Sequence, residues 1–129
     1  MTAKDSLRSR PMTTPEIVLV GEAYFTPTFP KVQEAVTYIW SEHNVGAAAT
    51  KPYHARVVWK HGDAVIDDTS VECSALGANE AATRQTQLSA PVESGIDYSI
   101  ELWVDMDHYA DNQYSEGLNY AYHAVTVDD

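Results

Sequence analysis

Apolar and polar residues alternate with a period of two along most of the chain. In the stretch EAVTYIWSEH, one face of an extended segment carries Val36, Tyr38 and Trp40, and the other carries Thr37, Ile39 and Ser41. This period is typical of a β-strand with one buried face. No segment carries a sustained helical stripe, so the pattern predicts an all-β fold.

The alternation divides the chain into about seven strands separated by turn signals. The predicted strands are residues 16–25, 34–43, 53–60, 64–73, 80–88, 97–105 and 118–127. Short strands with a turn signal roughly every ten residues favour a two-sheet β-sandwich. We therefore predict an extended arm at residues 1–15 and a single sandwich domain at residues 16–129.

Strand alternation also sorts large side chains between core and surface. Tyr98, Ile100, Leu102 and Val104 are expected to point into the core, which puts Trp103 on the outer face of the same strand. An outward tryptophan with acidic neighbours is a candidate contact for a partner, provided that no loop or neighbouring strand covers it.

The two other tryptophans and the single cysteine are assigned to the interior. Trp40 and Trp59 lie in line with Tyr38 and Val57, which are expected to face the core. Cys73 is the only cysteine, so it cannot form an intrachain disulfide and is expected to be a buried thiol. Packing alone must then hold the two sheets together.

The charge of the chain is strongly and unevenly negative. The formal net charge is -11, residues 1–15 contribute +2, and residues 16–129 therefore carry -13, which is -11 minus 2. Phosphate groups are repelled by a surface of this sign, so we do not expect a nucleic-acid-binding face.

The N-terminal arm, MTAKDSLRSRPMTTP, is weakly basic and polar. It has no apolar run and is not a secretory signal, and no stretch approaches the ~20 apolar residues of a membrane span. Its composition predicts no fold of its own in a free monomer. Because its sign is opposite to that of the domain, Arg8 and Arg10 are candidates for contact with the acidic surface of a neighbouring subunit.

The stretch VDMDHYADNQYSEGLNYAY combines many acids with many tyrosines. Acids occupy relative positions 1, 3, 7 and 12, as in a calcium loop, and they are Asp105, Asp107, Asp111 and Glu116. Tyr109 and Ala110 stand where such a loop needs an oxygen ligand and a glycine, so we expect a long turn rather than a metal site. Tyr109 and Tyr114 are candidates to join Trp103 in a contact patch.

No pattern of catalytic residues emerges, and no cofactor is expected. The histidines are spread over different predicted strands and turns, at His43, His54, His61, His108 and His123. None of them forms a close ligand pair or part of a nucleophile motif, and the scattered glycines form no phosphate-binding loop. We therefore expect a protein that is not an enzyme.

Short motifs along residues 16–127 resemble the CARDB family, the cell-adhesion-related domains of bacteria and archaea. An Asn-x-Gly turn follows the second strand, a hairpin and a Leu-x-x-Asn segment come next, and a G-x-Y-x-I strand leads into the acidic turn. The matching residues are Asn44, Gly46, Gly62, Leu76, Gly95, Tyr98, Val104, Asp105, Glu116 and Asn119. The resemblance implies an immunoglobulin-like or fibronectin III-like sandwich that serves as a non-catalytic spacer or adhesive module.

Two functions remain open at this point. The first is a structural subunit that decorates or joins a larger assembly, such as a virion head, a virion tail or another surface array, through contacts with protein subunits or copies of itself. The second is an extracellular adhesion module that binds carbohydrate or a cell-surface ligand, with Trp103, Tyr109 and Tyr114 as a stacking platform. Neither needs insertion into a membrane.

Overall fold

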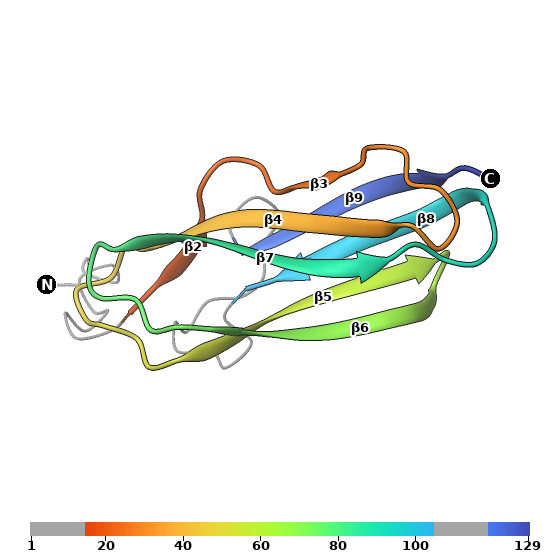
Figure 1. The fold of residues 1–129 in the computed structure, drawn as a ribbon. Helices are drawn as coiled ribbons and strands as arrows, with labels where there is room; N and C mark the ends of the chain where they lie inside the picture. The colour runs from red at the N-terminus through yellow and green to blue at the C-terminus, as the bar shows by residue number, and fades with distance from the viewer. Residues whose placement is uncertain (1–14, 105–118) are drawn as a thin grey trace, which may run out of the picture.

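The computed structural model describes residues 15–104 and 119–129, and these residues form eight β-strands and no helix (Figure 1). The strands are β2 (Ile17–Leu19), β3 (Tyr24–Thr26), β4 (Ala35–Asn44), β5 (Tyr53–His61), β6 (Ala64–Cys73), β7 (Ala81–Ser89), β8 (Gly95–Trp103) and β9 (Tyr120–Val127). The all-β prediction is confirmed. Within these two ranges no helix is long and apolar enough to cross a membrane.

The strands form two antiparallel sheets that pack face to face. In the first sheet β4 is central, with β7 on one side and both β2 and β3 on the other. The second sheet has the order β6-β5-β8-β9. The chain crosses between the sheets from β4 to β5, from β6 to β7 and from β7 to β8 (Figure 1), and the result is the predicted immunoglobulin-like sandwich.

The N-terminal strand differs from the prediction. A single strand was expected over residues 16–25, but the structure divides it into β2 and β3, which pair with different parts of β4. Leu19 lies opposite Glu42, and Tyr24 lies opposite Ile39. Between these two pairs the N-terminal segment advances by five residues, whereas β4 advances by only three. The two extra residues leave the ladder next to Gly21, whose φ of 68° is accessible to glycine at little cost.

The remaining predicted strands agree with the observed ones to within about two residues, the usual uncertainty at strand ends. The hairpin between β5 and β6 turns at Gly62, which adopts a φ of 60°. The β7 to β8 connection ends at Gly95, whose φ is 152°. Both glycines occupy conformations that disfavour other residues, and this explains why they carry the turn signals seen in the sequence.

The core lies between the two sheets and contains the residues that alternation assigned to it. Its largest fully buried side chains are Trp40, Trp59, Tyr38, Tyr53, Ile17, Ile100 and Leu102. Cys73 is buried among them, as predicted. Trp59 is unusual, because its indole Nε1 is buried without a hydrogen-bond partner among the described residues.

Candidate interaction surfaces

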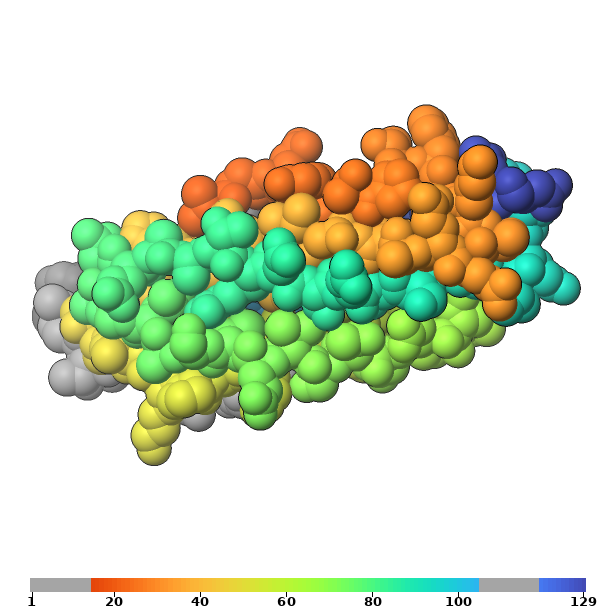
Figure 2. Space-filling view, viewed as in Figure 1, coloured from red at the N-terminus to blue at the C-terminus, as the bar shows by residue number. Residues whose placement is uncertain are grey.

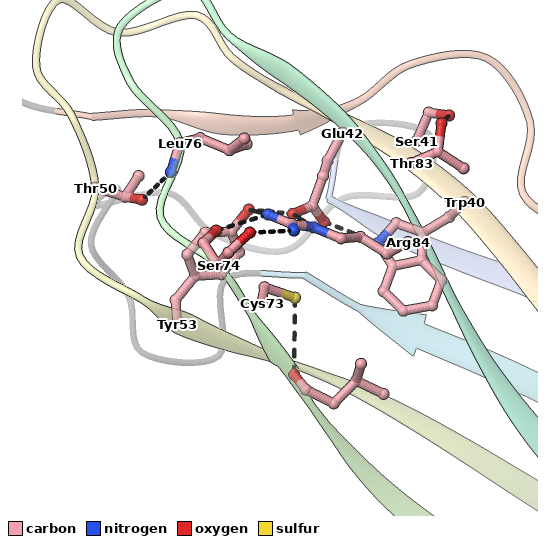
Figure 3. A network of polar contacts seen from close by, with 11 residues as sticks. Trp40, Ser41, Glu42, Thr50, Tyr53, Cys73, Ser74, Leu76, Thr83 and Arg84 are labelled. Carbon is pink, nitrogen blue, oxygen red and sulfur yellow. Dashed lines mark hydrogen bonds and ion pairs between the residues drawn. The ribbon is translucent and has the colours of Figure 1, made fainter.

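A polar network lies inside the sandwich at the end where β4 finishes and β5 begins (Figure 3). Glu42 is fully buried, and one oxygen of its carboxylate accepts hydrogen bonds from the hydroxyl of Tyr53 and from Nε of Arg84, the latter at 3.0 Å. Its other oxygen accepts the indole N–H of Trp40 at 2.8 Å. Both carboxylate oxygens are therefore used within the fold, across both sheets.

Arg84 extends this network towards the surface. Its guanidinium donates to the hydroxyl and the carbonyl of Ser74, at 2.8 Å and 2.7 Å, and lies over the ring of Tyr53. Burial and the hydrogen bond to Glu42 raise the pKa of Tyr53, so this phenol stays protonated and donates. The network links β4, β5 and β7, and because these strands belong to both sheets it joins one sheet to the other inside the sandwich.

The outer face of the second sheet carries a row of aromatic and basic side chains. Leu102 and Val104 are buried in the core, and Trp103 between them points outward and is half-buried. The guanidinium of Arg56 lies 5.4 Å from the centre of its ring, and the ring of Tyr120 lies at 5.2 Å. Trp103 is thus held between neighbours on β5 and β9.

Ion pairs on the same outer face neutralise part of its charge. Arg56 donates two hydrogen bonds to Asp68, and these lower the pKa of Asp68 and raise that of Arg56. Lys60 contacts Glu101 at 3.3 Å. Glu101 is on the same face of β8 as Trp103 but is only 8% exposed, and Lys60 on the adjacent strand β5 contacts it.

A first cleft lies beside this face, between β9 and the segment that joins β2 to β3. It has a volume of about 330 Å³, and its lining includes Glu22, Tyr122 and His123. Tyr122 is 49% exposed. Nε2 of His123 already pairs with the hydroxyl of Tyr38 at 3.0 Å, so the groups that the cleft offers to a small polar ligand are the exposed ring of Tyr122 for stacking and the carboxylate of Glu22 for hydrogen bonding.

A second cleft lies at the opposite end of the domain from the network, where β5 and β7 end and β6 begins. In Figure 2 this end of the domain is on the right. The cleft has a volume of about 410 Å³ and is lined by His61, Ile66, Asp67, Ser89, Ala90, Pro91, Val92, Glu93 and Tyr98. The rings of His61 and Tyr98 stack at 4.3 Å, and the hydroxyl of Tyr98 donates to the carbonyl of Glu93. This bond fixes the β7 to β8 loop in the manner of a tyrosine corner.

Exposed apolar and acidic residues surround the second cleft. The large apolar side chains here are Val65, Ile66, Val92 and Ile96, with exposures of 52%, 45%, 72% and 66%. Asp67 and Glu93 line it, and no lysine or arginine of the described residues does so. Asp63 and Asp97 flank it in the adjoining turn and bulge, where the carbonyl of Asp97 accepts the N–H of Gly62.

Only one of the predicted contact residues falls within the described part of the chain. Trp103 is on the outer face, as its strand alternation indicated. Arg8, Arg10, Tyr109 and Tyr114 lie outside the described residues, so their roles remain predictions. The same holds for the four acids of the calcium-like stretch. In residues 15–104 and 119–129, no three His, Cys, Asp or Glu side chains are close enough to hold a metal ion.

Known structures share this architecture. A CARDB domain from Pyrococcus furiosus, whose crystal structure is a complex with di-metal ions, aligns with a TM-score of 0.62 at 20% identity, over 89% of this chain and 94% of that domain. The solution structure of the same domain gives a TM-score of 0.64 over 90% of this chain and 97% of that one. This protein has the CARDB fold. The predicted resemblance is confirmed at the level of structure.

More distant structures contain the same fold within larger proteins. The sporulation control protein Spo0M from Bacillus subtilis aligns with a TM-score of 0.62 at 10% identity, over 90% of this chain and 50% of that one. A β-glucosidase from Erythrobacter marinus gives 0.59 at 14% identity, over 87% of this chain and 16% of the enzyme. No family model and no curated protein matches the sequence. At these identities the likeness establishes the fold alone.

Asn44 and Gly46, two of the residues behind the CARDB resemblance, have structural roles. Asn44 is completely buried, and its side-chain oxygen accepts the backbone N–H groups of Glu16 and Gly46, both at 3.0 Å. Its side-chain nitrogen donates to the carbonyls of Ala48, Leu76 and Gly77. Asn44 thereby joins the chain entry, the β4 to β5 loop and the β6 to β7 loop. The Asn-x-Gly motif is a feature of the fold rather than of a binding site.

Sequence reasoning missed both clefts and the Glu42 network. Val92 and Ile96 lie in a predicted turn region next to acidic residues. Turns are usually polar, so these two apolar residues were the available signal for the second cleft. The network left no such signal, because Glu42, Tyr53 and Arg84 are far apart in sequence and each resembles an ordinary strand residue.

Proposed function

We propose that the protein is a non-catalytic interaction module that binds protein subunits of a larger assembly through the outer face of β6, β5, β8 and β9. The observation that carries this proposal is the position of Trp103, which points outward and is fixed between Arg56 and Tyr120. Tryptophan, tyrosine and arginine are the residues enriched at the energetic centres of protein interfaces. A virion or a cell-surface array is the kind of assembly that we envisage.

The CARDB fold is compatible with this role. The sandwich offers a rigid sheet face, and a side chain already held by its neighbours loses little conformational freedom on binding. The ion pairs of Arg56 with Asp68 and of Lys60 with Glu101 surround the aromatic row. A partner face that presents both apolar and charged groups would complement it.

An adhesion module for carbohydrate is the second candidate, and the cleft beside Tyr122 favours it. An exposed tyrosine next to Glu22 combines a flat apolar surface with a hydrogen-bonding group. Trp103 suits a sugar less well, because the guanidinium of Arg56 already lies over its ring.

The two candidates are separated by a matched pair of variants. Tyr122 lies opposite Glu101 in the β8–β9 ladder and therefore shares the outer face with Trp103. Tyr122→Glu places a charge on this face, and Tyr24→Glu places the same charge on the other sheet, where Tyr24 is 55% exposed. Both full-length variants are produced in the native host and followed by co-sedimentation with virions or with the cell-surface fraction. The two variants and the unmodified protein are also applied to a panel of immobilised glycans.

Loss of co-sedimentation in Tyr122→Glu alone, with no glycan bound, supports the assembly role. Glycan binding that Tyr122→Glu abolishes and Tyr24→Glu retains supports the adhesion module instead. Equal behaviour of the two variants in both assays would show that the outer face is not the binding surface.

A further inference from the structure

We propose that the second cleft, at the end of β5 and β7, binds the basic N-terminal arm of another copy of this chain. The cleft exposes Ile66 and Val92 and is lined by Asp67 and Glu93, so it offers apolar contact with a negative rim. It suits a segment that has both apolar and cationic side chains. This surface is separate from the outer face around Trp103.

The arm has the composition that the cleft requires. Residues 7–12 read LRSRPM, in which two arginines alternate with apolar or small residues. In an extended segment, side chains at alternate positions point to opposite sides. One side can then fill an apolar cleft while Arg8 and Arg10 meet carboxylates at its rim. Arginine is suited to this task because its guanidinium binds carboxylates through two hydrogen bonds.

The opposite charges of arm and domain favour this pairing over others. Residues 1–14 carry three basic side chains and one acidic, whereas the described residues hold fourteen acidic and five basic ones. Two such domains repel each other unless a basic segment lies between them. Four carboxylates lie in or beside the cleft, from Asp63, Asp67, Glu93 and Asp97, and no described ion pair engages any of them.

The length of the arm indicates that it acts between copies. The chain enters the sandwich where Glu16 accepts the N–H of Val45, and the cleft is level with the bond between Ala90 and Glu34. Glu34 and Val45, which mark these two positions, are eleven residues apart along the extended chain of β4, and this separation corresponds to about 36 Å at ~3.3 Å per residue. In a fully extended chain, the Cα of Arg10 lies at most about 22 Å from the Cα of Glu16. The arm of one copy therefore cannot place this residue at its own cleft.

An arm at one end and a cleft at the other make the contact head-to-tail. Such a contact joins two different surfaces, so it extends into a ring or a filament unless one surface is blocked. Each copy would supply one arm and accept one. This geometry is a device for building the larger assembly, but it does not require that the outer face around Trp103 takes any part.

Two full-length variants and their mixture test the proposal. The arm variant is Arg8→Glu with Arg10→Glu, and the cleft variant is Asp67→Lys with Glu93→Lys. Analytical ultracentrifugation measures the mass of each alone and of both together. We expect the unmodified chain to self-associate and each variant to do so at least about tenfold more weakly.

The mixture should regain self-association, with the two variants alternating along the assembly. The unmodified arm of the cleft variant can enter the intact cleft of the arm variant, and the acidic arm of the arm variant is complementary in charge to the lysine-lined cleft of the cleft variant. Lys31→Glu with Lys51→Glu is the control, since it changes the charge by the same amount as the arm variant and should leave self-association intact.

Three results would overturn the proposal. The first is an unmodified chain that stays monomeric at the highest concentration reached, and the second is a mixture that stays monomeric although each variant is folded by circular dichroism. The third is a cleft variant that self-associates as well as the unmodified chain. A failure of Tyr122→Glu to affect partner binding would leave the arm and the cleft untouched, so the two proposals can fail separately.

Discussion

Nε of Arg84 lies 3.0 Å from Oε1 of Glu42, and this ion pair joins β7 to β4 inside the sandwich. The Glu42 side chain is fully buried, while that of Arg84 is 12% exposed. Removing one partner of a buried pair leaves the other charge without compensation. Arg56 and Asp68 form a second pair on the surface, with side-chain exposures of 38% and 45%. The two pairs allow a direct comparison within one protein.

We expect Glu42→Ala to lower the free energy of unfolding by about 3 kcal/mol or more, because Arg84, Tyr53 and Trp40 all lose a partner. Asp68→Ala should cost less than about 1 kcal/mol, since water solvates Arg56 once the pair is broken. Urea denaturation followed by tryptophan fluorescence measures both. Equal costs for the two variants would contradict the structural role assigned to Glu42.

The surface pair also has a pH signature. Hydrogen bonds from Arg56 hold the pKa of Asp68 below its ordinary value of 3.8. A lowered pKa in the folded state stabilises the protein above pH 3.8, and this contribution is lost as the pH falls through the folded value. Asp68→Asn should therefore be slightly less stable than the unmodified chain at neutral pH, by under about 1 kcal/mol because the pair is exposed. The difference should vanish at pH values below both pKa values, and a difference that grows with acidity would disprove the assignment.

The two core tryptophans should respond differently to replacement by phenylalanine. Trp40 donates its indole N–H to Glu42, whereas the N–H of Trp59 has no partner among the described residues. Both substitutions remove a similar volume, but only Trp40→Phe takes a donor from a buried carboxylate. We expect Trp40→Phe to be the more destabilising by about 1–3 kcal/mol. Thermal unfolding under identical conditions gives the ranking, and the reverse order would indicate that the N–H of Trp59 is satisfied in solution.

Asn44→Asp tests whether the Asn-x-Gly motif acts through the amide group. The carboxylate keeps the shape of the side chain and can still accept the N–H groups of Glu16 and Gly46. It has no donor for the carbonyls of Ala48, Leu76 and Gly77. We expect a loss of about 3 kcal/mol in unfolding free energy. Gln87→Glu adds the same charge at an exposed position and should change stability by less than about 0.5 kcal/mol.

Calcium provides a test of the acidic stretch between β8 and β9. We expect no large rise in melting temperature on addition of calcium, because Tyr109 and Ala110 replace the ligand and glycine of a calcium loop. Differential scanning calorimetry with calcium and with a chelator measures this. A large rise that Asp107→Ala abolishes would show that the loop binds the ion in spite of these two residues.

The sequence by itself determined which face of β4, of β5 and of β8 is buried. Successive side chains of a strand point to opposite sides, so the alternation around Tyr38 and around Ile100 reports burial without knowledge of any partner. Glycines at obligatory turns, such as Gly62, marked where strands end. These are local properties, and local spacing is sufficient to predict them.

Tertiary structure alone decided which residues meet. Two segments of the N-terminal strand pair with different parts of β4, because the register of a ladder depends on both strands. Glu42, Tyr53 and Arg84 come together from three strands and two sheets. The cleft beside Tyr98 exists only because the ends of β5 and β7 and the start of β6 meet at one end of the domain. Periodicity specifies the side on which a residue lies, whereas contact between distant segments depends on how the two sheets pack.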